Sequence, residues 1–234
     1  MRLTDILENL AHIKERLHIA CSRTGRDPEQ VRLVGVTKTV AIDRIRQAVA
    51  SGVSVLGENY VQEARRKIDN LADLKPEWHF IGRLQSNKAK TAVELFDWIQ
   101  TVDRESLALA LNREAVKKEK FLPVLIQVNV GGEETKSGAA PGDVLPLYRS
   151  LSKMEALQVR GLMTLPPYCD NPQDVRPYLQ KLKRLLEQLR QTAEQPEQLT
   201  ELSMGMSHDF EVAIEEGATL IRIGTALFGS RPSA

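Results

Sequence analysis

The sequence predicts an α/β fold, a closed (β/α)8 barrel of the TIM type that is preceded by one extra N-terminal helix. Eight short apolar runs alternate with segments of helical periodicity, and a candidate helix follows each run except the last. Near-continuous apolar strands joined by helices favour a parallel sheet with both faces covered. An open doubly wound sheet is the alternative, but no GxGxxG pattern follows the first run. The length of 234 residues suits a single domain over 1–234.

The first predicted element is an amphipathic helix over residues 3–22. Apolar side chains recur there at helical spacing, at Ile6, Leu10, Ile13 and Leu17. Gly25 and Pro28 end the pattern. We therefore expect residues 1–24 to form a helix that packs on the outside of the barrel.

The apolar runs, rich in β-branched residues, are the predicted strands. They cover residues 31–38, 53–59, 78–82, 98–102, 124–130, 159–165, 202–206 and 220–224. Helical periodicity between them is clearest over 42–50, 87–96, 106–118 and 175–191. The charged runs at 65–67 and 117–120 fall in helical patterns, and we expect them to lie on solvated faces.

Two connections show neither pattern and are predicted to be irregular. Residues 131–143 follow the fifth strand and are rich in glycine. Pro166-Pro167 and Asn171-Pro172 mark the second connection, after the sixth strand. Barrels carry their sites on the loops that follow the strands, so we expect 131–143 to be a mobile loop on that face.

Composition excludes several classes of function. The formal charge is +1, from 32 basic and 31 acidic residues, which indicates no nucleic-acid partner and no anionic membrane surface. Cys21 and Cys169 lack metal-type spacing, as do the histidines, so we expect a reduced chain without a metal. The opening residues do not read as a signal peptide, and no run has the length of a membrane span. The sequence thus predicts a soluble, cytoplasmic protein.

Residues 201–229 carry the strongest functional signal. Two apolar runs each end in small or hydroxyl residues, first Gly205, Met206 and Ser207, then Gly224 and Thr225. Such residues at a strand end expose backbone N–H groups that can bind an anion. Barrels build phosphate sites after their last two strands. We therefore predict that the chain holds a phosphorylated small molecule.

Lys38 is predicted to close the first strand, in VRLVGVTKTV. Lysine is costly to bury, so its place at the end of an apolar run needs a reason. One interpretation is that its ammonium simply reaches solvent. The other is a Schiff-base lysine, whose amine becomes nucleophilic when desolvation and nearby cations lower its pKa.

Arg222 is predicted to point into the barrel from the last strand, because it alternates with Leu220 and Gly224. It either pairs with a buried carboxylate from another strand or donates to an acceptor on a bound ring. Ser207 stands at a predicted helix N-cap, with Asp209 in the first turn. A cap needs no ligand, but Ser207 can also bind phosphate.

Other strand-end residues are weaker candidates when each is considered alone. Asn59 and Tyr60 end the second predicted strand, His79 lies in the third, and Met163 ends the sixth. Any of them is more often a core or strand-end residue than a ligand. Their value is that they fall on the predicted functional face.

These residues lie in segments that resemble a known family. GVTK, GENY, HFIGRLQSNK, GLMT and SMGMSHDFEVAIEEGATLIRIGTALFG occur in order over nearly the whole chain. They resemble the pyridoxal phosphate homeostasis proteins (the YggS/PROSC family). The resemblance implies the barrel of fold type III pyridoxal phosphate enzymes, similar to the alanine racemase N-terminal domain but without its second, β-rich domain.

The resemblance also assigns roles to residues of this sequence. It implies that Lys38 forms a Schiff base with pyridoxal 5′-phosphate and that Arg222 faces the pyridine nitrogen. It places the phosphate at Ser207, Gly224 and Thr225, with Gly205 and Met206 nearby. It places Asn59, His79 and Met163 around the cofactor, and ETKSG, around Lys136, matches a family loop.

The function that the resemblance implies is vitamin B6 homeostasis, with effects on amino-acid and keto-acid pools and no established catalytic activity. An arginine facing the ring nitrogen keeps it unprotonated and weakens the cofactor as an electron sink. A barrel uses most of 234 residues, which leaves no second domain to close its mouth. We expect a monomeric holder that buffers pyridoxal phosphate or delivers it to apo-enzymes.

Two alternatives stay open. A fold type III enzyme, such as an amino-acid racemase, needs an acid or base opposite Lys38, and Tyr60 and Lys136 are the local candidates. A barrel for a plain sugar phosphate explains the paired cradles but gives Lys38 and Arg222 no role.

Overall fold

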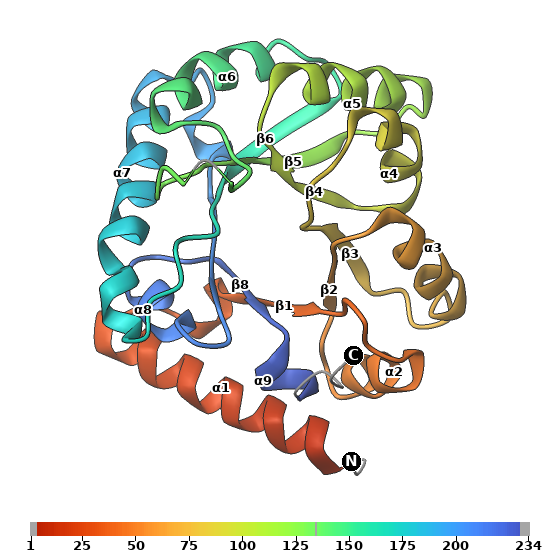
Figure 1. The fold of residues 1–234 in the computed structure, drawn as a ribbon, viewed down its shortest axis with the longest axis vertical. Helices are drawn as coiled ribbons and strands as arrows, with labels where there is room; N and C mark the ends of the chain where they lie inside the picture. Colours follow the sequence, from red (N-terminus) through yellow and green to blue (C-terminus); the bar gives the residue numbers. More distant parts are fainter. Residues whose placement is uncertain (1–3, 134, 230–234) are drawn as a thin grey trace.

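The fold is a closed barrel of eight parallel strands, surrounded by helices (Figure 1). The structure, a computed structural model, describes residues 4–133 and 135–229. The strands are hydrogen-bonded in chain order, and the ring closes where β8 pairs with β1, with Val34 opposite Arg222. The predicted barrel is confirmed, and the open sheet is excluded because neither end strand is left unpaired.

The strands lie within the predicted apolar runs or within two residues of them. They are β1 Arg32–Val36, β2 Val55–Glu58, β3 Glu77–Phe80, β4 Trp98–Val102, β5 Leu122–Gln127, β6 Leu157–Met163, β7 Glu201–Met206 and β8 Leu220–Ile223. Several end sooner than predicted, because the chain turns away from its neighbours at the mouth of the barrel. Lys38 therefore lies in the turn after β1, and Asn59 directly follows β2.

A helix follows every strand. The helices are α1 Thr4–Thr24, α2 Ile42–Ala50, α3 Val61–Asn70, α4 Ala89–Leu95, α5 Glu105–Lys117, α6 Val144–Leu151, α7 Arg176–Thr192, α8 Phe210–Glu215 and α9 Thr225–Phe228. The short α9 follows β8, where the sequence pattern predicted none. None of the described helices combines the length and apolar character that a membrane crossing requires.

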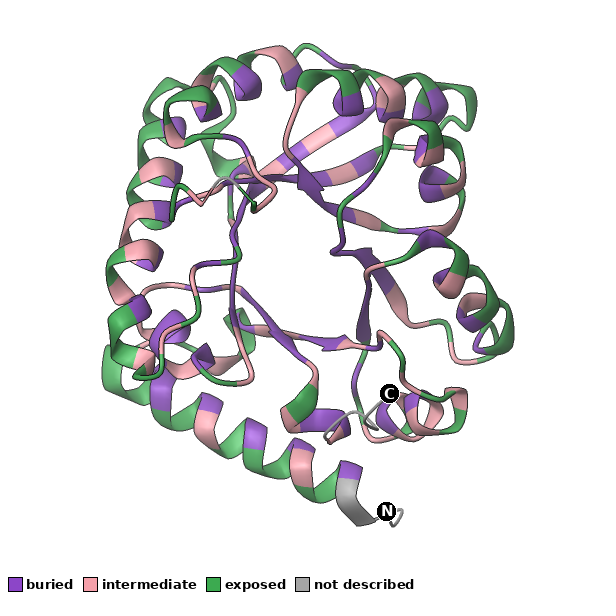
Figure 2. Cartoon of the chain, viewed as in Figure 1, coloured by how far each residue is buried: buried purple, intermediate pink, exposed green. Residues whose placement is uncertain are grey.

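Two apolar clusters hold the architecture together. The larger one lies between the helices and the outer face of the barrel, and Figure 2 shows each helix buried on its inner side and exposed on its outer side. The smaller one fills the barrel interior and consists of Val34, Val55, Leu125, Met163 and Leu220. Burying the two faces of the sheet in this way stabilises the barrel by the hydrophobic effect.

Helix α1 packs along α8 and α9, as expected for an added N-terminal helix. Its predicted stripe is buried, with Leu10 3% exposed. Polar bonds fix the docking, since the Asn9 amide donates to the Leu227 carbonyl oxygen (3.0 Å) and Arg16 pairs with Glu211 (2.6 Å). Helix α1 thereby supports the end of the chain that carries β7, β8 and their loops.

The expectation of solvated charge runs is half correct. Lys117 and Lys118 are exposed at the end of α5. Lys67 is buried on α3, however, with 1% of its side chain exposed, so the prediction is wrong for this residue. Its ammonium is buried because two carboxylates accept hydrogen bonds from it.

The packing of α1 can be tested by truncating its stripe. Leu10→Ala should lower the free energy of unfolding by about 3 kcal/mol, since it leaves a cavity in the core. Leu7 lies on the same helix and is 61% exposed, so Leu7→Ala should change stability by less than about 0.5 kcal/mol. Denaturant unfolding of both variants measures this difference, and equal losses would show that α1 is not docked on this face.

Candidate functional site

A cavity of about 350 Å³ opens at the carboxyl ends of β1, β7 and β8. It is lined by seven of the ten predicted site residues, namely Lys38, Asn59, Met206, Ser207, Arg222, Gly224 and Thr225. The other lining residues are Val36, Ile81, Leu165, Tyr168 and His208. The other three predicted residues, His79, Met163 and Gly205, do not line it.

A larger cavity of about 690 Å³ lies beside it, between the starts of α3 and α4. Asn59 borders both cavities, and Arg83, Lys88 and Arg104 give the larger one a cationic wall. Size alone favours the larger cavity, but it contains neither Lys38 nor the loops after β7 and β8. We therefore assign the site to the smaller cavity, where a lysine, an arginine and those loops meet.

Lys38 reaches this cavity from the turn that follows β1. The residue is half-buried, and its Nζ lies 5.2 Å from the centroid of the Tyr60 ring. Within the described residues, Nζ has no ion pair and no hydrogen bond. An aromatic face attracts a lysine ammonium without forming a hydrogen bond to it. When the group loses its proton, the amine nitrogen is therefore free to react. Lys38 thus lines the cavity, where its amine is accessible.

The loops after β7 and β8 form one continuous cradle. Within the described chain, the backbone N–H groups of Ser207, His208 and Thr225 find no acceptor. The hydroxyl oxygen of Ser207 accepts from the N–H of Ala226 (3.2 Å), which joins the two loops. Free N–H groups that converge on a cavity are suited to bind an anion.

The predicted role of Ser207 as a helix N-cap is wrong. Helix α8 begins at Phe210, and Asp209 occupies the N-cap position. The Asp209 carboxylate accepts from the N–H of Met206 (2.6 Å) and so closes the turn itself. Burial raises the pKa of Asp209, against the opposing effect of that hydrogen bond. With the turn closed by Asp209, the Ser207 hydroxyl is left to join the two loops.

Gly205 shapes the cradle from behind. Its φ of +92° lies in the region that favours glycine. A Cβ atom at this position would lie 2.6 Å from the Cβ of Ala213 on α8. Gly205 therefore allows the end of β7 to turn tightly against α8, although it does not itself line the cavity.

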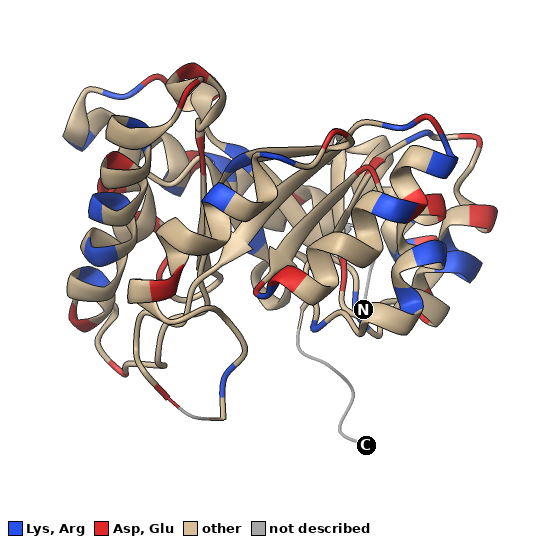
Figure 3. Ribbon diagram, turned by 90° about the horizontal axis from the view of Figure 1, so that it is seen from above, with Lys and Arg blue, Asp and Glu red and all other residues tan. Residues whose placement is uncertain are grey.

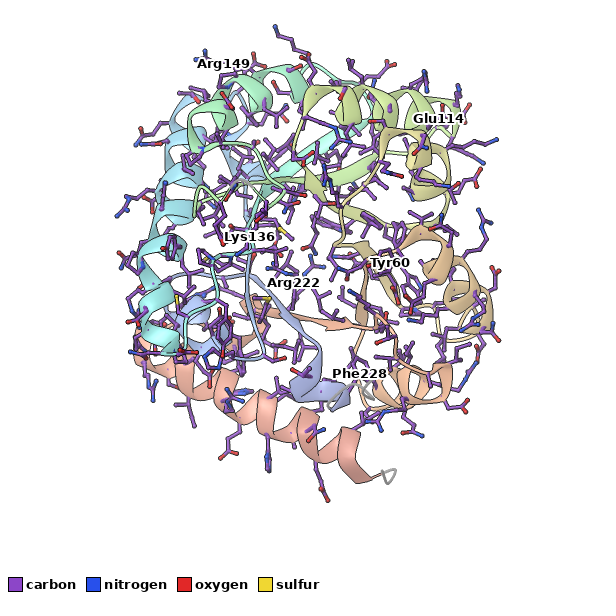
Figure 4. The ribbon with its side chains drawn as sticks, in the orientation of Figure 1. Tyr60, Glu114, Lys136, Arg149, Arg222 and Phe228 are labelled. Atoms are coloured by element: carbon purple, nitrogen blue, oxygen red, sulfur yellow. The ribbon has the colours of Figure 1, made fainter. Side chains whose placement is uncertain are left out.

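Arg222 lies in the barrel interior with its guanidinium at the base of the cavity, and Figure 4 shows it projecting over the centre of the ring. The residue is 3% exposed. Nη1 donates to the Ser203 hydroxyl (2.6 Å) and Nη2 to the Thr164 carbonyl oxygen (2.7 Å). No carboxylate in the described chain pairs with it, so the ion-pair interpretation is wrong. Burial lowers the pKa of Arg222 to about 10, which leaves the guanidinium charged at neutral pH.

Comparison with known proteins places the chain in a family. The model of the alanine racemase N-terminal domain matches residues 9–232. A pyridoxal phosphate homeostasis protein from Aquifex aeolicus is 49% identical over 96% of this chain and 97% of its own length. The chain belongs to the pyridoxal phosphate homeostasis protein family. The resemblance inferred from the sequence motifs is thereby confirmed.

Solved structures agree with this assignment. PipY of Synechococcus elongatus, solved without and with pyridoxal phosphate, is 40% identical to this chain in both structures. The TM-scores are 0.85 and 0.81 over 96% and 93% of this chain, and both comparisons cover 100% of the PipY chain. The barrel described above is therefore that of a solved family member.

Beneath the cavity, this member of the family contains a polar chain that the sequence analysis missed. The Ser203 hydroxyl, which accepts from Arg222, donates to Gln100 Oε1 (2.6 Å). The Gln100 amide nitrogen lies 2.6 Å from His79 Nδ1, and His79 Nε2 lies 2.8 Å from the Glu77 carboxylate. An amide nitrogen can only donate, so Nδ1 accepts and Nε2 donates. The chain thus runs in one direction, from a cation to a carboxylate.

The hydrogen-bonded series of side chains from Arg222 to Glu77 explains why His79 is absent from the cavity. His79 is 0% exposed inside the barrel and stacks on Trp98, with ring centroids 5.3 Å apart. Burial lowers the pKa of His79, although the Glu77 carboxylate opposes this effect. A neutral imidazole is also what the direction of the chain requires. The sequence does contain a signal for this hydrogen-bonded series. Polar residues occupy inward-facing positions on three strands, at His79, Gln100 and Ser203.

Met163 and the two residues named for a racemase also have clear positions. Met163 is fully buried in the interior cluster, so it supports the base of the cavity. Lys136 lies on the segment between β5 and α6, and its Nζ donates to the Pro166 carbonyl oxygen (3.1 Å) and pairs with Glu133 (2.5 Å). Figure 3 shows that basic and acidic residues are interspersed over the surrounding helices. Tyr60 is 53% exposed, and its ring lies against Lys38.

The polar chain can be tested by removing its central member. Gln100→Leu leaves the Ser203 hydroxyl and His79 Nδ1 without a partner, which should lower the free energy of unfolding by about 3 kcal/mol. Gln158 is half-buried on β6 and makes no side-chain hydrogen bond within the described residues, so Gln158→Leu is the matched control. Denaturant unfolding measures both variants, and a Gln100→Leu protein as stable as the wild type would contradict the chain.

Proposed function

We propose that the chain binds pyridoxal 5′-phosphate in the smaller cavity and holds it reversibly on Lys38 as a Schiff base. It would thereby buffer the cofactor in the cytoplasm or deliver it to apo-enzymes. The observation that carries the proposal is the convergence of three complementary groups on one cavity. These are the Lys38 amine, the charged Arg222 guanidinium and the free N–H groups of the cradle.

The donors fit this molecule group by group. The phosphate would accept from the N–H groups of Ser207, His208 and Thr225 and from the Ser207 hydroxyl. Arg222 would donate to the ring nitrogen, since arginine has donors only. When bound, the cofactor supplies an aldehyde that condenses with an amine and releases water. Lys38 is the amine on this cavity, and its Nζ lies 5.2 Å from the centroid of the Tyr60 ring.

The arrangement favours holding over catalysis. Because Arg222 remains protonated at neutral pH, it would donate to the ring nitrogen and leave that nitrogen without a proton. An unprotonated ring accepts electrons less readily, which weakens the chemistry on which racemases depend. The ammonium of Lys136 is occupied by Pro166 and Glu133, and the Tyr60 ring lies against Lys38 rather than opposite it. Neither is placed as a second acid–base group.

Transfer to a partner requires only that another amine replace Lys38 on the same carbon. Free amino acids and the active-site lysines of apo-enzymes are amines of this kind. We further propose that the protein acts as a monomer, and light scattering that gave twice the mass of the chain would overturn this part of the proposal.

The covalent attachment is tested at Lys38. Borohydride adds hydride to a carbon–nitrogen double bond and leaves a stable amine, so cofactor held on a lysine becomes permanently fixed. Wild-type protein mixed with pyridoxal phosphate and then separated from unbound cofactor should retain absorption in the visible or near-ultraviolet range and, after borohydride, show a mass increase located on Lys38. Lys38→Ala should show neither. Peptide mass spectrometry identifies the modified residue.

Lys88→Ala is the matched control, because Lys88 borders the larger cavity and not the proposed one. It should retain the adduct on Lys38 in full. A wild-type protein that acquires no adduct on Lys38 would refute the proposed function, and an adduct on Lys88 would move the site to the larger cavity.

The racemase alternative is tested by proton exchange. Protein loaded with pyridoxal phosphate should exchange the Cα hydrogen of amino acids in deuterated water no faster than the free cofactor does, and Tyr60→Phe should leave the rate unchanged. Mass spectrometry of an amino-acid panel measures this exchange. Fast, stereospecific exchange that Tyr60→Phe abolishes would identify an enzyme instead.

A further inference from the structure

A cluster of three charged side chains lies beneath the turn that carries Lys38. The Lys67 Nζ atom is 2.5 Å from the Glu58 carboxylate and 2.7 Å from the Glu63 carboxylate. Lys67 and Glu58 have 1% and 0% of their side chains exposed, and Glu63 has 25%. Buried ion pairs of this kind add little net stability, because desolvation of the charges offsets their attraction. A gain in stability therefore does not explain the cluster, and the residues that it holds in place are the better guide to its role.

The cluster is bonded to the residues on both sides of Lys38. Before it, the Thr37 carbonyl oxygen accepts from Lys67 Nζ (2.5 Å), and the Thr37 hydroxyl donates to Glu58 (2.6 Å). After it, the backbone N–H of Thr39 donates to Glu63 (2.8 Å). Both neighbours of Lys38 are thus fixed to one buried group that joins the end of β2 to helix α3.

The backbone of this turn needs such support. Thr39 has a φ of +62°, a left-handed conformation that is unfavourable for a β-branched residue. Residues persist in that region only where their surroundings hold them there, and such positions concentrate at functional sites. Within the turn, the hydrogen bond from Thr39 to Glu63 acts directly on the strained residue.

We propose that Lys67, Glu58 and Glu63 form a positioning cluster that fixes the Thr37–Thr39 turn and so directs the Lys38 amine into the cavity. This inference rests on the proposed attachment of pyridoxal phosphate to Lys38. The chemical step is the condensation of the amine with the aldehyde, which forms a carbon–nitrogen double bond and releases water. The cluster makes no hydrogen bond with the amine. It acts through the backbone on the position of the amine, and the Glu63 carboxylate also attracts the Lys38 charge.

The test measures how fast the cofactor attaches to Lys38. Wild-type and variant proteins are mixed with pyridoxal phosphate, treated with borohydride at successive times, and analysed for adduct on Lys38 by mass spectrometry. Lys67→Met keeps a long side chain but removes the charge and the bond to Thr37. It should slow attachment by about tenfold or more, since small misplacements of reacting groups have effects of this size.

Arg176→Met is the matched control. Arg176 also bridges two carboxylates, those of Glu215 and Glu216, but it lies on α7 and does not contact the Lys38 turn. It should attach cofactor at the wild-type rate, within about twofold. Thermal unfolding of every variant is measured alongside, so that loss of fold is separated from loss of positioning.

Glu63→Ala provides a second, milder variant because its carboxylate is partly exposed. It should also slow attachment, and it decides the matter if Lys67→Met does not fold. Adding Thr39→Gly to Glu63→Ala should restore part of the rate, because glycine adopts positive φ without strain. Absence of any recovery would contradict the role assigned to the Thr39 conformation.

The outcomes separate this inference from the proposed function. If wild-type protein forms no adduct on Lys38, the proposed function fails. If wild-type protein forms it, and folded Lys67→Met and Glu63→Ala proteins form it at the same rate, the proposed function stands and the positioning cluster is refuted.

Discussion

The buried charge of Arg222 is the constraint on which the interior of the barrel depends. An isolated charge in so enclosed a position is strongly unfavourable unless polar groups compensate it. No carboxylate in the described chain forms a direct ion pair with the guanidinium, although the Asp209 carboxylate attracts it from a longer distance. Two neutral oxygens accept from it instead, and the chain through Ser203, Gln100 and His79 ends at the Glu77 carboxylate. A buried polar network is stable only when every member has its hydrogen-bond partners. This hydrogen-bonded series of side chains therefore fixes where the guanidinium lies.

The Lys38 turn meets the same problem with a different solution. There the buried charge belongs to Lys67, and two carboxylates compensate it directly. The two systems lie in different parts of the barrel, one inside the ring and one between β2 and α3. The amine and the guanidinium that face the cavity are therefore held by separate buried groups. Their relative position is set before a ligand enters, which reduces the entropy lost on binding.

The sequence predicted the parts of this arrangement that follow from local pattern. Alternation of apolar runs and helical segments gave the barrel, and alternation within the last strand placed Arg222 on the inner face. The prediction failed where a side-chain bond, rather than periodicity, decides the local structure. The pattern predicts Ser207 as a helix cap, but the Asp209 carboxylate, bonded to the N–H of Met206, closes that turn, and Asp209 is the residue at the N-cap. Lys67 was read as part of a solvated run, since its carboxylate partner Glu58 comes from another element.

Under the proposed function, the buried interactions that fix Arg222 and Lys38 suit a protein that holds pyridoxal phosphate better than one that catalyses a reaction with it. Contacts that stabilise the resting cofactor as strongly as the reacting one tighten binding without raising a rate. A charged Arg222 that donates to the ring nitrogen is such a contact, because it is present before any substrate arrives. On this proposal the cradle would bind a phosphate group that takes no part in bond changes. Release, in contrast, needs only an amine that displaces Lys38, whose Nζ makes no hydrogen bond within the described residues.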